Sequence, residues 1–262
     1  MPGPIVTLTT DFGCHDHYVA AMKGVILTIC PPATIIDIVH QIQPQAIRQA
    51  GYLLACAAPY FPPGTVHVAV VDPGVGTERR PIAVGTERGV YVGPDNGLFS
   101  LVLEWDPPQW AVHLSNPRYH LAKVSATFHG RDVFAPAGAH LACGADPHEM
   151  GEPLTPADLH TEQMLQEYEK GAGPWQACVL HIDRFGNLIT GFRVPDPRAE
   201  LVVTVSGQRI GHLSRTFADV APGEMVAYVG SSGLLEIAVR QGSAATALGM
   251  DLGSPVHIRE AA

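Results

Sequence analysis

The sequence predicts an α/β protein in two parts: an N-terminal α/β/α sandwich with a mainly parallel sheet, and a smaller C-terminal domain that is β-rich and barrel-like. Three observations support this fold class. Strand-like and helix-like segments alternate in the first half. The expected strands there are continuous apolar runs, which are typical of parallel sheets covered on both faces. From residue 177 onward, short β-like runs separated by Gly, Pro, Ser and Asp predominate.

The first half opens with a strand and a helix. The β-branched run IVTLTT predicts a strand over residues 5–10, and it ends at Asp11. Asp16 is the expected N-cap of a helix that runs to about residue 29. Four apolar residues at helical spacing indicate that helix: Val19, Met22, Ile26 and Ile29.

Two further strands and a second helix follow. ATIIDIV predicts a strand over 33–39, a helix opened by Pro44 is expected over 44–58, and TVHVAVV predicts a strand that leads into Asp72. Parallel sheets bind ligands beyond the carboxyl ends of their strands. Asp11 and Asp72 both follow such ends, so we expect them in one site although 61 positions separate them.

The domain boundaries follow from a change in composition. Residues 1–155 form the expected α/β domain and 177–262 the β-rich domain. The polar, proline-bearing stretch 156–176 is the expected linker. Five runs indicate strands of the β-rich domain: ACVLHID, LVVTVSG, MVAYVG, LLEIAV and PVHIRE.

Composition limits the possible functions. Of the 262 residues, 46% are apolar and 16% charged, so we expect a globular chain. The net charge of -9 argues against nucleic acid as the main partner and suits a cationic small molecule. The five cysteines are widely spaced, so we expect no disulfide framework and a reducing cytoplasmic location. Neither a signal peptide nor a run of the roughly 20 apolar residues that span a bilayer is evident, so no membrane partner is expected.

The segment VVDPGVGTERR joins Asp72 to Arg79 and Arg80 across a glycine-rich turn. It is not a P-loop, because no Gly-Lys-Ser/Thr follows. One interpretation is a tight turn with a local Asp72–Arg79 salt bridge. The other is a site that orients water or holds an anion, which the position at a strand end favours. His129 precedes a helix that Asp132 is expected to cap, and it could complete a proton-handling set with Asp72 and Arg79.

Two N-terminal motifs also have competing interpretations. Asp11 in TTDFG is either a ligand-binding carboxylate, suited to ribose hydroxyls, or a capping acid in a loop. A kinase-type DFG is excluded, since the Gly-rich loop and the V-A-I-K and H-R-D motifs are missing. CHDH offers His15 and His17, but no second cluster has ligand spacing, so we expect no metal.

Two C-terminal motifs could bind parts of one ligand. In HIDRFGNLIT, Phe185 could stack on a base and Asn187 could hydrogen-bond a purine edge, although a simple turn is the alternative. In YVGSSGLLEIAV, Ser231 and Ser232 could hold a carboxylate, although a Gly/Ser hairpin is the alternative.

Taken together, the motifs resemble the SAM hydroxide adenosyltransferase family, the adenosine-forming S-adenosyl-L-methionine (SAM) hydrolases related to fluorinase and chlorinase. The resemblance spans nearly the whole chain through seven segments: TLTTDFG, YVAAMKGVILTICPPATIIDIVH, YFPPGTVHVAVVDPGVGTERRPIAV, VGPDNGLFSLVLE, TFHGRDVFAPAGAHLA, IDRFGNLIT and GLLEIAVRQGSAA. It implies attack of water or hydroxide on C5′ of SAM, which releases adenosine and methionine without a cofactor. It also implies a homotrimer, with SAM between the α/β domain of one subunit and the β-rich domain of the next.

The resemblance further implies roles for individual residues. The implied water-handling groups are Asp72, Arg79 and His129. Asp11 is the implied contact to the ribose hydroxyls. The methionine ammonium would contact Asp16 and Asp183, and its carboxylate would contact Ser231. The implied adenine pocket comprises Phe185, Asn187 and Phe217. The remaining implied substrate contacts are Tyr18, Phe128 and Tyr228.

Several positions depart from the halogenating relatives. At Asp72 and at His129, fluorinase and chlorinase have tyrosines in a halide pocket. A carboxylate 4 Å from a halide would repel it by about 4 kcal/mol at an effective dielectric of 20. A halide-dependent 5′-halo-5′-deoxyadenosine synthase is therefore the second candidate. The third, from a different class, is a non-catalytic adenosine- or SAM-binding module. Ser232 stands where fluorinase has an arginine, and Tyr18 stands where it has a serine.

Overall fold

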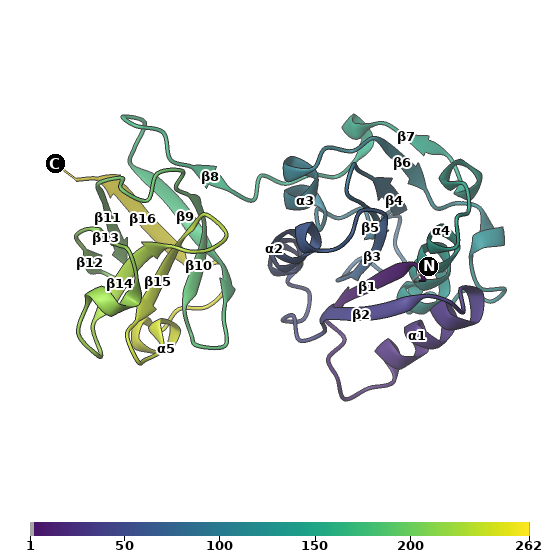
Figure 1. Cartoon of the computed structure of the whole chain (residues 1–262), viewed down its shortest axis with the longest axis horizontal. Coiled ribbons are helices and arrows are strands. Elements are labelled where there is room, and N and C mark those ends of the chain that lie inside the picture. Colours follow the sequence, from purple (N-terminus) through teal and green to yellow (C-terminus); the bar gives the residue numbers. More distant parts are fainter. Residues whose placement is uncertain (1–2, 262) are drawn as a thin grey trace. The chain divides into compact units, whose positions relative to one another are not determined.

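The protein divides into two compact units, with the boundary between Glu162 and Gln163. The structure is a computed structural model that describes residues 3–261. Figure 1 shows helices around a sheet in the first unit and mostly strands in the second. The predicted fold class, an α/β part followed by a β-rich part, is confirmed.

The first unit contains a seven-stranded sheet of order β2-β1-β3-β5-β4-β6-β7. Its strands are β1 Ile5–Thr10, β2 Thr34–Val39, β3 Thr65–Val70, β4 Pro81–Gly85, β5 Gly89–Pro94, β6 Trp110–His113 and β7 Pro153–Leu154. The pairs β2–β1, β1–β3 and β3–β5 are parallel, whereas β4, β6 and β7 pair antiparallel. The mainly parallel sheet is confirmed, with an antiparallel extension that the sequence did not indicate.

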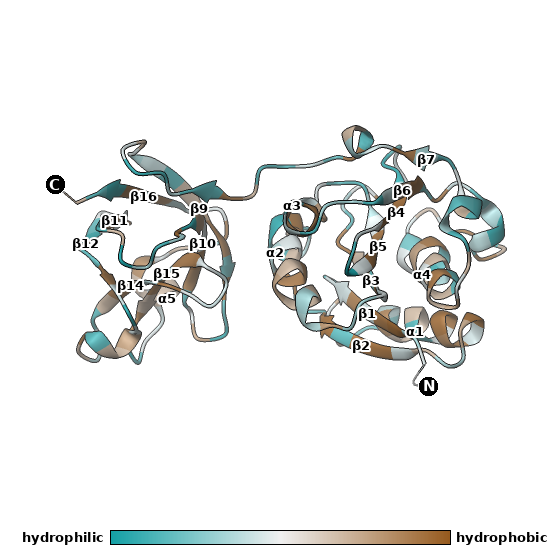
Figure 2. Ribbon diagram, turned by 45° about the horizontal axis from the view of Figure 1, so that its top comes forward, coloured by the Kyte–Doolittle hydropathy of each residue, from teal (hydrophilic) through white to brown (hydrophobic). Residues whose placement is uncertain are grey.

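Helices cover both faces of this sheet. Helices α1 (Tyr18–Ile29) and α4 (Ala135–Ala142) pack together, as do α2 (Ile47–Ala57) and α3 (Ser100–Trp105). In β1, Val6 and Leu8 belong to the core shared with α1 and α4, and the alternate residues Thr7 and Thr9 face the opposite layer. All four are fully buried. Burial of a side chain such as Leu8 stabilises the fold by about 1.5–3 kcal/mol. In Figure 2 the hydrophobic residues accordingly gather on the strands of this sheet.

Two helices begin later than predicted. The N-cap of α1 is His17, no side-chain hydrogen bond caps the helix, and Asp16 is exposed. The expectation that Asp16 caps α1 was therefore wrong. Helix α2 begins at Ile47, three residues after the proline expected to open it, because Gln45 has a φ of 68°. That left-handed conformation cannot be part of a right-handed helix.

The helix after His129 also begins differently. Gly130–Phe134 forms a π-helical turn that continues directly into α4. Asp132 lies inside this turn, fully buried, and accepts hydrogen bonds from the Arg131 side chain and from Ser125 N. It was expected to cap the helix but instead ties the preceding loop to the turn. Turns of this kind are frequent at functional sites.

The second unit is a nine-stranded, barrel-like sheet of order β12-β11-β16-β9-β10-β15-β14-β13, with β8 beside β10. Its strands are β8 Gln166–Glu167, β9 Trp175–Ile182, β10 Leu188–Arg193, β11 Leu201–Val205, β12 Gln208–Ile210, β13 Leu213–Ser214, β14 Met225–Val229, β15 Leu234–Val239 and β16 Pro255–Glu260. Its one α-helix within the described residues is α5 (Ala244–Leu248). Leu188, Phe192 and Leu235 are fully buried in its core. The strand expected from each of the five C-terminal runs is present.

Two cysteines form a bond that the sequence did not indicate. Cys30 and Cys143 are disulfide-bonded, with Cα atoms 5.9 Å apart, although 113 positions separate them in the sequence. Each directly follows the last residue of a helix, α1 or α4, and these two helices pack against each other. The expectation that the cysteines form no disulfide framework was therefore wrong for this pair. Within residues 3–261, no helix is long and apolar enough to cross a membrane.

Candidate functional site

A cavity of about 450 Å³ lies at the carboxyl ends of β1 and β3. Its lining includes Phe12, Pro44, Gln45, Val70, Pro73, Val75, Thr127 and Gly130. It also includes five residues that the sequence singled out: Asp11, Tyr18, Asp72, Phe128 and His129. Asp11 and Asp72, expected in one site, both line this cavity. Parallel pairing of the two strands places their carboxyl ends at one edge of the sheet.

The glycine-rich turn brings the Asp72 segment against the His129 segment. Gly76 has a φ of 78°, and a Cβ there would lie 2.5 Å from the carbonyl oxygen of Ala126. Only glycine allows this conformation together with this close approach. The turn therefore packs against the loop just before His129, and Arg79 can reach both partners.

Arg79 bridges Asp72 and His129. Its Nε donates to Asp72 Oδ1 at 2.8 Å, and its Nη2 donates to Asp72 Oδ2 at 2.5 Å. The same Nη2 lies 2.7 Å from His129 Nδ1. The side chains of Arg79 and Asp72 are only 9% and 5% exposed, so solvent screens this ion pair little. The structure thus brings all three predicted groups together, with His129 50 positions from Arg79.

This contact fixes the protonation of His129. A guanidinium has only donors, so Nδ1 of His129 must accept, and the neutral ring has its proton on Nε2. Burial, and to a lesser degree the positive charge of Arg79, lower the pKa of His129 below its usual value of 6.5. Neutral His129 is therefore the form at pH 7. Its remaining ring nitrogen, Nε2, is then an N–H donor, and both His129 and Asp72 line the cavity.

Asp11 and an aromatic group form the rest of this cavity. Asp11 Oδ2 accepts a hydrogen bond from the backbone N of Gln45 at 2.9 Å, which leaves its other oxygen available to a ligand. Tyr18 and Phe128 meet edge to face with ring centroids 5.1 Å apart, and Phe12 packs on both. The aromatic rings give the cavity an apolar part of its lining.

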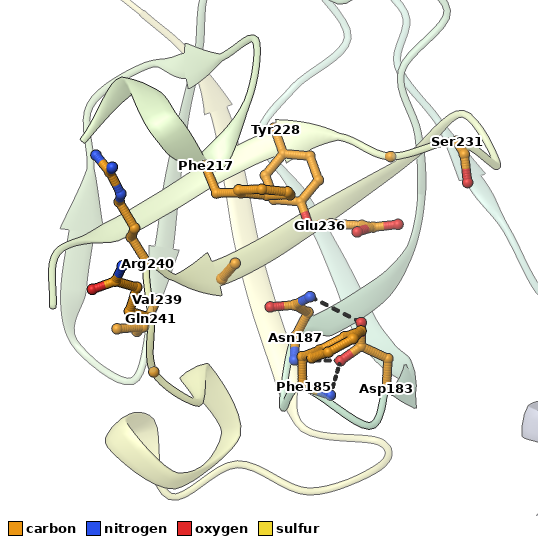
Figure 3. Close-up of a pocket in the computed structure, with 13 residues that line it drawn as sticks. Asp183, Phe185, Asn187, Phe217, Tyr228, Ser231, Glu236, Val239, Arg240 and Gln241 are labelled. Atoms are coloured by element: carbon orange, nitrogen blue, oxygen red, sulfur yellow. Dashed lines mark hydrogen bonds between the residues drawn. The ribbon is translucent and has the colours of Figure 1, made fainter. Parts of the chain in front are cut away.

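A second cavity, of about 810 Å³, lies within the β-rich unit (Figure 3). Six residues predicted from the sequence line it: Asp183, Phe185, Asn187, Phe217, Tyr228 and Ser231. Phe185 is 76% and Phe217 54% exposed, which is unusual for aromatic residues of this size. Exposed aromatic rings beside a cavity are suited to stacking on a flat ligand.

Asp183 orders the turn between β9 and β10. Its Oδ1 accepts from the backbone N of Phe185 and of Asn187, and its Oδ2 accepts from Asn187 Nδ2, each at 2.9 Å. These bonds include the dashed lines of Figure 3. Because a carboxylate only accepts, the amide nitrogen of Asn187 faces Asp183 and its oxygen remains an acceptor for a ligand.

The sequence-based interpretation missed several residues of this cavity, chiefly Glu236 and Arg240. Glu236 is the single charged residue of the apolar strand β15, and that contrast was the available signal. Arg240 Nη1 donates to the carbonyls of Ala218 and Val220, so it supports the segment that presents Phe217.

Asp16 lies in the lining of neither cavity and is exposed in the loop before α1. Arg80, the second arginine of the glycine-rich turn, instead pairs with Asp95 through Nη2 at 2.6 Å and with the carbonyl of Asp158. Across the described part of the chain, no group of three His, Cys, Asp or Glu side chains could hold a metal ion.

The fold and the two cavities place the protein in a class: two-unit α/β proteins with one cavity beside charged strand-end groups and another beside exposed aromatic rings. Matches to two protein-family models identify the family within this class. The model of the SAM hydroxide adenosyltransferase N-terminal domain matches residues 6–151, and that of the C-terminal domain matches 177–257. The chain therefore belongs to the SAM hydroxide adenosyltransferase family.

Individual relatives agree with this assignment. The chain is 46% identical to an (R)-S-adenosyl-L-methionine hydrolase of Thermus thermophilus, covering 97% of this chain and 98% of the relative. It is 40% identical to one of Salinispora tropica, over 98% of both. A fluorinase of Actinoplanes is 28% identical, also over 98% of both. A solved structure from Thermotoga maritima superposes with a TM-score of 0.86 at 34% identity, covering 97% of this chain and 99% of that one.

Proposed function

We propose that this protein hydrolyses SAM to adenosine and L-methionine by in-line attack of water on C5′. The observation that supports it most directly is the Asp72–Arg79–His129 cluster at the edge of a cavity. The relatives that match along nearly their whole length at 40–46% identity are named for this hydrolysis.

The chemistry asks for little beyond a well-placed nucleophile. The bond between C5′ and the sulfonium breaks, and methionine leaves as a neutral thioether that needs no proton. The protein must therefore hold a water in line with the C5′–S bond and accept a proton from it. Acid–base assistance of this kind contributes roughly 10²–10⁴-fold.

The tautomer of His129 assigns complementary roles to the two cavity-facing groups. In the proposal, His129 Nε2–H donates to one lone pair of the water, and Asp72 accepts a proton from it. The second lone pair is then directed at C5′. Arg79 holds both groups in register through its fork of donors.

The other predicted residues fit parts of the same substrate. Asp11 would accept from the ribose hydroxyls, and Tyr18 and Phe128 would pack beside the sugar. In the β-rich unit, Phe185 and Phe217 would stack on adenine, and the oxygen of Asn187 would accept from its amino group. Asp183 and Ser231 would contact the methionine ammonium and carboxylate, and Tyr228 would close that end. Asp16 would also approach the ammonium.

We further propose a homotrimer in which SAM lies between the α/β unit of one subunit and the β-rich unit of the next. Each cavity supplies only part of the groups that SAM requires, which supports a shared site. Light scattering should give three times the chain mass. Mixing the Asp72→Ala and Asn187→Ala variants, with exchange of subunits, should restore activity that neither variant has alone. A lack of restoration despite exchange would contradict the shared site.

Hydrolysis is tested by incubating the purified protein with SAM in ¹⁸O-labelled water, with and without chloride, and with a chelator. We expect adenosine with one ¹⁸O at the 5′ position, methionine, and no effect of the chelator. A 5′-chloro nucleoside would instead indicate halide transfer. Saturable binding without turnover would indicate a binding module, and unlabelled adenosine would exclude attack of water on C5′.

A further inference from the structure

We propose that Glu236 is a substrate-specificity residue that binds the α-ammonium group of the methionine part of SAM, together with Asp183. This inference rests on the proposed function, because it concerns the same β-rich cavity. It adds a second carboxylate to the amino-acid end of the site. It also predicts discrimination between adenosyl sulfonium compounds with and without an ammonium group.

The strand register directs Glu236 into the cavity. Tyr228 on β14 and Glu236 on β15 are directly opposite each other, so their side chains share one face of the sheet. Both side chains line the cavity, and Figure 3 shows Glu236 between Tyr228 and Ser231. Gly230 makes room for it, because a Cβ there would overlap Glu236 Oε1. Gly230, Tyr228 and Glu236 therefore lie close together on this face of the sheet.

The capacity to accept hydrogen bonds favours Glu236 over Asp183 as the main ammonium contact. A carboxylate has about four acceptor positions, and an ammonium group has three donors. Asp183 already accepts three hydrogen bonds, from Phe185 and twice from Asn187. The Tyr228 hydroxyl belongs to the residue opposite Glu236, and no other donor of the described residues bonds its carboxylate, so Glu236 retains most of its capacity. A ligand with three donors therefore finds more acceptors on Glu236.

Charge favours the same ligand. Among the ion pairs found within residues 3–261, none involves Asp183 or Glu236, and the guanidinium of Arg240 donates to two carbonyls. Burial, and then repulsion from Asp183, raise the pKa of Glu236 above its usual value. Two neighbouring carboxylates that form no ion pair with a protein cation are stabilised by a cationic ligand. The nearby Ser231, proposed to hold the substrate carboxylate, fits an α-amino acid with both charges.

The test compares the Glu236→Gln variant with wild type on two substrates. One is SAM, and the other is 5′-deoxy-5′-(dimethylsulfonio)adenosine, which retains the sulfonium but lacks the amino acid. We expect kcat/KM for SAM to fall about 10- to 100-fold, mainly through KM, because a charged hydrogen bond is lost. For the second compound we expect a change below about threefold. Adenosine affinity, measured by calorimetry, should be unchanged and so report an intact fold.

Glu260→Gln is the matched control, because Glu260 is likewise a strand glutamate beside a tyrosine, Tyr168, but lies outside the cavity. It should alter neither substrate's kinetics. Equal losses on both substrates, or no loss on SAM, would overturn the role of Glu236. If wild-type protein proves unable to hydrolyse SAM, the proposed function fails, and SAM affinity measured by calorimetry still decides the inference. A selective loss of SAM affinity in Glu236→Gln supports it, and an unchanged affinity overturns it.

Discussion

Replacing Arg79 with lysine tests the proposed water-handling cluster most directly. The guanidinium donates to both oxygens of Asp72 and, through Nη2, also contacts His129 Nδ1 at 2.7 Å. A lysine ammonium retains the positive charge beside Asp72 but cannot bridge both partners with the same geometry. Arg79→Lys therefore removes the connection to His129 and leaves the charge balance of the buried pair intact.

The expected loss of activity follows from the hydrogen bonds of Arg79 that a lysine cannot make. Removing one charged partner from so buried an ion pair would cost about 3–5 kcal/mol of stability. The lysine avoids this cost because it retains the positive charge. The remaining loss is one hydrogen bond to a charged donor, about 1.5–3 kcal/mol. If the bond is needed only to position the nucleophile, that energy appears in the activation barrier. We expect kcat for SAM hydrolysis to fall about 10- to 100-fold, with KM changed less than about threefold.

The assay is chromatographic measurement of adenosine release, with adenosine affinity determined by calorimetry as a check on the fold. Arg80→Lys is the matched control, since Arg80 is the next residue but pairs with Asp95 outside the cavity. It should retain nearly full kcat. Arg79 does not have the proposed role if Arg79→Lys keeps more than about a third of the wild-type kcat, or if Arg80→Lys loses as much as Arg79→Lys.

Three further outcomes are expected. Asp72→Ala should slow turnover by roughly 10²–10⁴-fold while adenosine affinity stays nearly unchanged, and undiminished turnover would falsify its role. Burial lowers the pKa of His67 from 6.5 to about 4, so the unfolded chain takes up a proton on His67 at a higher pH than the folded protein does. The free energy of unfolding is therefore unaffected by His67 well above pH 6.5, and it should decline by about 3 kcal/mol as the pH falls to 4. Urea unfolding at several pH values should show this decline, and a His67→Gln variant should lack it. Thiol titration of the unfolded, unreduced protein should find three free thiols, whereas five would exclude the Cys30–Cys143 bond in solution. Reducing this bond should lower the free energy of unfolding by about 2–4 kcal/mol.

Most of the fold could be predicted because its strands are continuous apolar runs. β1 and β3 match their predicted ranges to within one residue, since an aspartate, Asp11 or Asp72, follows shortly after each carboxyl end. Helix starts were less predictable. The start of α2 depends on a positive φ at Gln45, a residue type that does not signal it, and the start of α4 depends on a π-helical turn. Such features arise from tertiary packing rather than local propensity.

The candidate site was predictable only in part. The contact between Asp72 and Arg79 is local, seven positions apart across a turn, so residue spacing indicated it. His129 and the disulfide partners come together through packing of distant elements, which spacing cannot reveal. Glu236 was overlooked because its strand is otherwise apolar, although a lone acid in such a strand is expected to have a partner.

The geometry of the cluster also bears on the choice between hydroxide and halide as nucleophile. Asp72 and Arg79 neutralise each other overall, so a simple count of charges predicts no repulsion. Asp72 and His129, however, line the cavity, whereas Arg79 is not part of its lining. An anion entering the cavity would meet the carboxylate before the guanidinium, and at short range the nearer charge dominates. A water molecule has both donors and lone pairs, so it can donate to Asp72 and accept from His129 at once. The groups that face the cavity are therefore matched to water and mismatched to a halide, which is why hydrolysis is the reaction proposed for this site.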